Sequence, residues 1–205
     1  WLFSSPSGVG IEQKLKSLIN PLTSKKVLSE YVDYRSNKIA DRVVKKLKNA
    51  SVSILGKHPD GFDTCEYNAS DLTDLTGTTI NQAEIRDVFT RAQLVSSDRA
   101  KKHYVEAEKS LIGLDNLNKE QLDRSFRLLC AFEDIVEEKK ANSLAVRCWP
   151  ETFTEYGCAA CAPMAMMSQA GVPSACEADV FGSVTTLLLQ ELVKEPAWMA
   201  DLVDI

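Results

Sequence analysis

Short apolar runs that alternate with longer amphipathic segments constrain the fold more than any other feature of this sequence. The pattern of strand, loop and helix recurs around Ser51, Thr78, Ser143, Val172 and Ala197. Strands that are joined by helical crossovers pair in parallel within one sheet. The sequence therefore predicts an α/β fold with a doubly wound, mostly parallel sheet and helices on both faces.

Two acidic residues directly follow two of these apolar runs. Glu177 comes after Val172–Ala175, and Asp201 comes after Ala197–Ala200, while Ser183–Val193 is predicted to be the crossover helix between them. The carboxyl ends of parallel strands meet at the edge where open α/β sheets bind ligands. Two carboxylates there form a candidate site for a hard cation, although acids in this position also cap the following helix.

Two further loops are expected at the same edge. The loop 56–62 follows the run at Ser51 and carries His58, which is a candidate ligand, general base or substrate contact, or is simply solvated. The run Ser143–Arg147 is followed by Trp149, Pro150 and Glu151, which adds a third acid to this edge. Asp179 is interpreted as the cap of the next helix rather than as a ligand.

The composition excludes several classes of protein. A net charge of −5 and a pI near 5.2 argue against a nucleic-acid partner. No apolar run approaches the roughly 20 residues that a membrane helix needs, and no basic-then-apolar signal segment is present. These features lead us to expect a cytoplasmic protein that does not act at a membrane.

Six cysteines agree with a reducing compartment. Cys158 and Cys161 have the spacing of a redox pair or of half a zinc site. A zinc ribbon needs a second such pair, whereas Cys148 and Cys176 stand alone in the sequence. We therefore expect the cysteines to be small core residues.

The helical segments divide the chain near Asn49. Residues 1–49 are expected to be the helical end of a truncated N-terminal domain with its linker, and residues 50–205 an α/β domain that carries the acids. Both ends look cut, so we expect a fragment of a longer protein. Helices are predicted at residues 27–47, 68–75 with Ser70 as cap, 82–94, 97–111, 118–140 and 158–170, with His103 exposed.

Three motifs resemble the L-fucose isomerase and L-arabinose isomerase superfamily, particularly its fucose isomerase-like members. They are the segment 176–182 (Cys-Glu-Ala-Asp-Val-Phe-Gly) with its leucine-rich helix, the segment 147–151 (Arg-Cys-Trp-Pro-Glu) and the loop 56–62 (Gly-Lys-His-Pro-Asp-Gly-Phe). The resemblance covers roughly Val27 to Ile205. It implies the middle domain of such an enzyme, with a β-rich C-terminal domain missing from this chain.

The resemblance also implies a chemistry for the acids. Members interconvert aldoses and ketoses with a divalent metal, most often Mn²⁺, bound by two acids and a distant histidine. By position, Glu177 and Asp201 correspond to the two metal ligands, and one of them is expected to move the proton. Trp149 is a candidate stacking platform for a sugar ring or a core residue, and Glu151 is a candidate either to contact a sugar hydroxyl or to support the residues that do.

The resemblance predicts a metal-dependent sugar isomerase that works through an enediol and is inactive as this fragment. The full-length protein is expected to act on a small sugar and to form a homo-oligomer. The alternative is a non-catalytic sugar-binding or assembly module that keeps the isomerase fold. The sequence does not separate the two.

Overall fold

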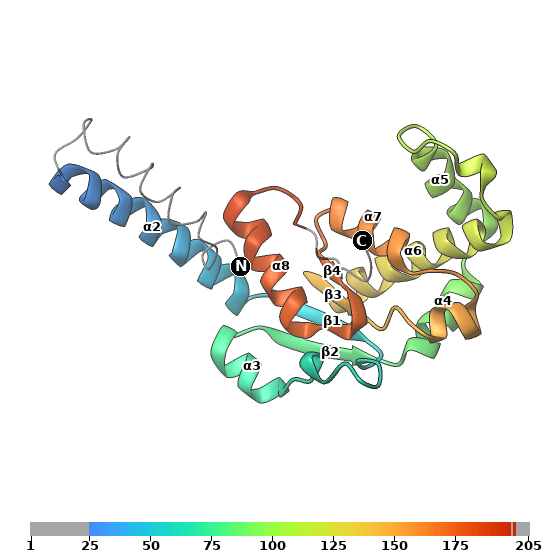
Figure 1. Cartoon of the computed structure of the whole chain (residues 1–205), viewed down its shortest axis with the longest axis horizontal. Coiled ribbons are helices and arrows are strands. Elements are labelled where there is room, and N and C mark those ends of the chain that lie inside the picture. The colour runs from blue at the N-terminus through green and yellow to red at the C-terminus, as the bar shows by residue number, and fades with distance from the viewer. Residues whose placement is uncertain (1–24, 198, 200–205) are drawn as a thin grey trace. The chain divides into compact units, whose positions relative to one another are not determined.

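The computed structural model of the chain describes residues 25–197 and residue 199 (Figure 1). The chain divides into two units between Arg42 and Val43, and every strand of the described residues belongs to the second unit. Helix α2 (Lys25–Lys48) runs across this division. The domain boundary expected near Asn49 stays a prediction.

A parallel sheet of four strands forms the centre of the second unit, in the order β2-β1-β3-β4. Each neighbouring pair is parallel, and Leu55 lies opposite both Ala83 and Val146. The predicted α/β class with a parallel sheet is confirmed. The strands are β1 (Ser51–Leu55), β2 (Thr79–Ala83), β3 (Ser143–Val146) and β4 (Ser174–Ala175).

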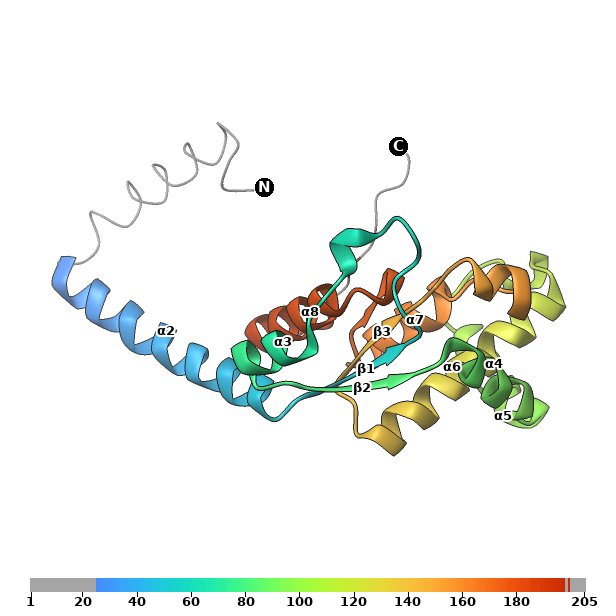
Figure 2. The ribbon, with the colours of Figure 1, turned by 90° about the horizontal axis from the view of Figure 1, so that it is seen from below.

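Helices cover both faces of this sheet. Figure 2 shows α6 and α8 on opposite sides of β1 and β3. In the described ranges, residues 25–197 and 199, no helix has the length and apolar character needed to cross a bilayer. The helices are α3 (Ala69–Thr76), α4 (Ile85–Leu94), α5 (Ser97–Ala107), α6 (Lys119–Lys139), α7 (Cys161–Gln169) and α8 (Val180–Val193).

Alternate side chains of the central strands enter two separate packed layers. Leu55, Leu144 and Val146 join the core that α4, α6 and α7 build, where Leu128 and Phe132 of α6 are fully buried. The other face of the sheet packs against α8, whose Val180, Val184 and Leu187 are buried, and here the hydroxyl of Ser183 donates to the hydroxyl of Ser143 at 2.9 Å. Because both faces are covered, β1 and β3 are buried on both sides, and their serines Ser53 and Ser143 are buried as well.

Asparagine and aspartate caps explain where several helices begin. The side chain of Asn68 accepts from the amides of Ser70 and Asp71, so Asn68 caps α3 and the predicted cap, Ser70, is wrong. Asn118 caps α6 in the same way. The carboxylate of Asp179 accepts from the amide of Gly182 at 2.8 Å, which confirms Asp179 as the cap of α8.

Several predicted boundaries differ from the observed ones. Gln82 pairs with Ile54 in the sheet, so the helix predicted from residue 82 begins at Ile85. Helix α5 ends at Ala107 rather than at residue 111. The strand predicted at residues 197–200 is not observed at Ala197 or Met199, and its other two residues lie outside the described part.

A matched pair of leucine substitutions tests the location of the core. Leu128 is 0% exposed and Leu94 is 81% exposed. Leu128→Ala is expected to lower the free energy of unfolding by about 2–5 kcal/mol, because it removes buried methyl groups and leaves a cavity. Leu94→Ala is expected to change it by less than about 0.5 kcal/mol. Urea unfolding followed by circular dichroism measures both, and equal losses would contradict this assignment of the core.

Candidate active site

The strand order places a topological switch point between β1 and β3. From β1 the chain first crosses to β2 on one side and then returns to β3 on the other side. At such a point the loops after the two strands diverge and leave a crevice at their carboxyl ends, where open α/β sheets bind ligands. The loop 56–62 follows β1, and the segment 147–151 follows β3. The structure therefore brings two of the predicted segments to one place.

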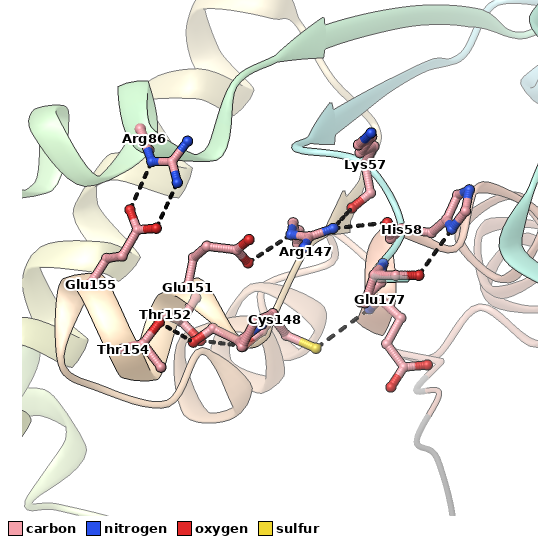
Figure 3. Close-up of polar contacts among 12 residues, drawn as sticks. Lys57, His58, Arg86, Arg147, Cys148, Glu151, Thr152, Thr154, Glu155 and Glu177 are labelled. Atoms are coloured by element: carbon pink, nitrogen blue, oxygen red, sulfur yellow. Dashed lines mark hydrogen bonds and ion pairs between the residues drawn. The ribbon is translucent and has the colours of Figure 1, made fainter. Parts of the chain in front are cut away.

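Arg147 joins these two segments through its guanidinium (Figure 3). Nε donates to Oε2 of Glu151 at 2.6 Å, and Nη1 donates to the carbonyl oxygens of Lys57 at 2.9 Å and His58 at 2.8 Å. The side chains of Arg147 and Glu151 are 12% and 16% exposed. The hydrogen bond from Arg147 lowers the pKa of the Glu151 carboxyl, against the opposing effect of burial. Glu151 is thus held as a carboxylate.

Gly56 allows the chain to leave β1 against this arginine. Its φ of +88° lies in the region that favours glycine. A Cβ at this position would lie 2.8 Å from Cβ of Arg147, which is too close. The missing side chain of Gly56 is therefore needed both for the turn and for the packing of Arg147.

His58 is fixed in one tautomer when its ring is neutral. Nδ1 lies 3.1 Å from the carbonyl oxygen of Pro59, and a carbonyl oxygen can only accept (Figure 3). Nδ1 therefore carries the proton and donates it, which leaves the lone pair on Nε2. A half-buried imidazole with this tautomer can accept a hydrogen bond, receive a proton or bind a metal through Nε2.

Trp149 is the exposed aromatic residue of the segment that follows β3. Trp149 is 39% exposed, so the alternative prediction that it is a core residue is wrong. The ring of Phe62 contacts it edge-on, with 5.8 Å between ring centroids and 71° between planes. This contact joins the two segments a second time, and the peptide bond from Trp149 to Pro150 is cis.

Glu177 lies in a short 3₁₀ turn, Cys176–Ala178, that follows β4. Glu177 and Ala178 have φ values of 58° and 52°, the left-handed region that non-glycine residues rarely adopt. The amide of Glu177 donates to Sγ of Cys148 at 3.4 Å, which joins the β4 end to the β3 end. Figure 3 shows its carboxylate directed away from Arg147 and Glu151. Glu177, the candidate metal ligand, thus lies at the same edge of the sheet.

Cys148 and Cys176, which stand alone in the sequence, are neighbours in the structure. The hydrogen bond from the Cys176 thiol, together with the amide of Glu177, lowers the pKa of Cys148 to about 7 in spite of burial. The same bond raises the pKa of Cys176. None of the six cysteines, all within the described residues, forms a disulfide. Four of them are buried, but Cys161 is exposed and Cys176 is half-buried, so the expectation of core cysteines is confirmed only in part.

One of the two expected Mn²⁺ ligands, Glu177, lies within the described residues. Carboxylate oxygens are donors that suit Mn²⁺. Glu177 provides a half-buried carboxylate at the carboxyl edge of the sheet and therefore fits the expected donor set. Asp201, the second expected ligand, lies outside the described residues.

A different group of possible metal ligands lies between α5 and α6. Suitable atoms of His103, Cys130 and Glu133 lie within 4.8 Å of one another, the one such group found in the described ranges. However, Arg99 donates to Oε2 of Glu133 at 3.1 Å, and His103 contacts the same oxygen at 3.1 Å. Burial also raises the pKa of Cys130 to about 11. A cation already neutralises this carboxylate, and His103 is paired rather than exposed as predicted.

The sequence interpretation gave Arg147 and Phe62 no role. Arg147 and Glu151 are four residues apart in the sequence, but residues 147–150 are not helical, so helical spacing does not account for their ion pair. The contacts of Arg147 with Lys57 and His58 span about 90 residues of sequence. They follow from the pairing of β1 with β3, which the sequence alone did not specify.

Curated relatives match this chain over most of its length. No family model matches it. A sulfoquinovose isomerase of Alkalicoccus urumqiensis is 26% identical over 206 residues, which is 100% of this chain and 42% of the relative. Sulfoquinovose isomerases of a Clostridium species (strain MSTE9) and of Priestia aryabhattai are 30% and 28% identical over 81% and 80% of the chain, and 37% of each relative is covered.

The chain therefore spans about two fifths of the length of the curated relatives it matches. Their name is that of a sugar isomerase, in agreement with the class of protein that the three sequence motifs resemble. The matched parts include the loop after β1 and the segments after β3 and β4, because the first alignment covers the whole chain. The similarity thus extends over all described residues of the candidate site.

The pair of Arg147 and Glu151 predicts a pH-dependent contribution to stability. Because the folded-state pKa of Glu151 is lowered, the contribution is full above the ordinary carboxyl range, near pH 4.3, and is lost as the pH falls through the folded pKa. Glu151→Gln is expected to cost about 1 kcal/mol at pH 7, allowing for solvent screening, and less at pH 3.

Urea unfolding at several pH values measures this difference. Glu155→Gln provides the control, because Glu155 also pairs with an arginine, Arg86, but in a more exposed place. The side chain of Glu155 is 38% exposed and that of Arg86 is 72% exposed. The control is expected to lose less stability than Glu151→Gln at pH 7. A Glu151→Gln loss that stays constant from pH 7 to pH 3 would argue against a charged pair.

Proposed function

We propose that the protein to which this chain belongs is a metal-dependent isomerase that interconverts an aldose and a ketose. The observation that supports it best is the similarity of the chain, over 80% or more of its length, to proteins named sulfoquinovose isomerase. The geometry agrees, since a histidine, an aromatic residue and two carboxylates gather at the switch-point edge of a parallel sheet. The activity belongs to the longer protein.

The reaction class sets what the site must supply. Converting an aldose to its ketose removes a proton from C2 and returns one to C1, through an enediol. A divalent cation, when bound, stabilises the negative charge that develops on the sugar oxygens. In this proposal Glu177 and Asp201 hold Mn²⁺, and one of these carboxylates transfers the proton, an effect worth on the order of 10²–10⁴-fold.

The remaining edge residues are proposed to bind the sugar. Trp149 presents an exposed ring next to Phe62, suited to the C–H face of a sugar ring. His58 can accept a hydroxyl hydrogen through Nε2, because Nδ1 is bound to Pro59. Glu151 stays ionised beside Arg147 and can accept from a sugar hydroxyl.

Sulfoquinovose, the sugar in the names of the relatives, is the first substrate to test. The full-length protein is titrated with Mn²⁺ and a panel of aldoses that includes sulfoquinovose, and ketose formation is followed. Metal-dependent conversion of any one aldose supports the proposal. Tight sugar binding without turnover would favour a non-catalytic sugar-binding module instead. Light scattering of the same sample tests the proposed homo-oligomer.

A pair of acid-to-amide substitutions tests the assigned ligand. Glu177→Gln is expected to lower kcat at least 10²-fold with little change in unfolding, because it removes a metal-binding and proton-transferring carboxylate. Asp179→Asn, two residues away, keeps a good capping side chain and is expected to retain activity. Full turnover by Glu177→Gln would remove Glu177 from the mechanism.

A further inference from the structure

Arg147 occupies the central position between the segments proposed to bind the sugar. Its backbone amide donates to the carbonyl of Leu55 at 2.9 Å, so the residue already lies beside the end of β1. Its side chain then contacts the first two residues of the loop after Gly56 and the carboxylate of Glu151. One residue therefore connects the end of β1 with the end of β3.

Two of the three guanidinium nitrogens have hydrogen-bond partners within the protein. Nε has a carboxylate partner, Nη1 has two carbonyl partners, and the side chain is 12% exposed. Figure 3 shows it between Lys57 and Glu151, in the interior of the cluster. The carboxylate of Glu151 balances the positive charge of Arg147, and the two hydrogen bonds from Nη1 are directed at the backbone of the loop. These hydrogen bonds connect Arg147 to the residues on both sides of it.

The hydrogen-bond partners of Arg147 belong to, or lie next to, residues that are proposed to contact the sugar. The carbonyl of His58 fixes the backbone from which the imidazole extends. The carboxylate of Glu151 is oriented directly, and Trp149 lies between Arg147 and Glu151 in the sequence. The contact of Phe62 with Trp149 connects the same two segments a second time. Displacement of Arg147 would thus shift three proposed contacts together.

We propose that Arg147 is a positioning residue that fixes the loop 57–62 against the segment 148–151 and thereby determines how tightly the sugar binds. This role rests on the proposed isomerase function. The planar fork of arginine reaches the carboxylate and the two carbonyls in fixed directions, which the single ammonium of lysine cannot do. Arg147→Lys keeps the charge and loses the fork.

The kinetic test uses the full-length protein with Mn²⁺ and sulfoquinovose, or another aldose that the wild type converts. Arg147→Lys is expected to raise KM about 10-fold and to leave kcat within about threefold, because the chemical groups at Glu177 are untouched. An unchanged KM, or a fall in kcat at constant KM, would overturn the proposal.

Arg127 offers a matched control. Its Nε donates to Asp123, an acid at the same spacing of four residues, and its Nη1 donates to the carbonyl of Val95. Its side chain is 18% exposed, and its partners lie on α5 and α6 or in the connection before them. Arg127→Lys is expected to leave KM within twofold. An equal rise in KM in Arg127→Lys and Arg147→Lys would indicate a general loss of stability and would overturn the positioning role of Arg147.

Hydrogen–deuterium exchange tests the positioning role independently of turnover. In the sugar-free full-length protein, Arg147→Lys and Arg147→Gln are expected to accelerate exchange at least fivefold in the peptide 57–65, where Phe62 and Cys65 have hydrogen-bonded amides. Exchange in α6 is expected to stay at the wild-type rate.

The two measurements separate the two proposals. If the wild type converts no sugar, the isomerase function fails, and acceleration confined to the peptide 57–65 still supports the role of Arg147 in fixing the loop. Unchanged exchange in that peptide overturns the role. Accelerated exchange in both variants throughout α6 overturns it as well, since Arg147 would then stabilise the whole domain.

Discussion

The parallel pairing of β1 with β3 is the constraint on which the site depends. Four residues of β1 lie opposite the four residues of β3, and both strands are nearly fully buried. Because the strands are parallel, both leave the sheet at the same edge. Residues that are some 90 positions apart in the sequence, such as Arg147 and His58, then come within hydrogen-bonding distance.

This pairing is stabilised by two apolar layers of different composition. On one face Leu55, Leu144 and Val146 contact a large core beneath α6, and on the other face β3 packs against α8. Each fully buried leucine or valine contributes about 1.5–3 kcal/mol of burial. The site lies beyond the last residue of each strand, at the edge of this core. Its geometry therefore depends on the core, which includes Cys148 and contacts Cys176.

The arrangement of elements was largely predictable because its signals are local. The apolar run at Ser51 ends at a glycine, and the structure has β1 (Ser51–Leu55) there. The cap of α3 was misplaced from Asn68 to Ser70, because both residue types cap helices and lie two positions apart. The helix predicted from residue 82 started too early, since pairing with Ile54 draws Gln82 into the sheet.

The location of the candidate site was predictable from the sequence, whereas its side-chain contacts were less so. Strand ends alone indicated that His58, Glu151 and Glu177 would share an edge. The contact of Cys148 with Cys176 depends on how β3 pairs with β4, and no periodicity in the sequence encodes that pairing. The same is true of the bonds from Arg147 to the loop after β1.

The backbone at Glu177 and Ala178 has a consequence for protein engineering. Two consecutive non-glycine residues in the left-handed region each cost about 1 kcal/mol or more relative to glycine. Structure-based redesign for thermostability would therefore favour glycine at position 178, where the buried methyl group of alanine is small. The resulting gain in stability would come with a more flexible peptide beside the carboxylate, so at this turn a gain in heat tolerance would act against the proposed role of Glu177.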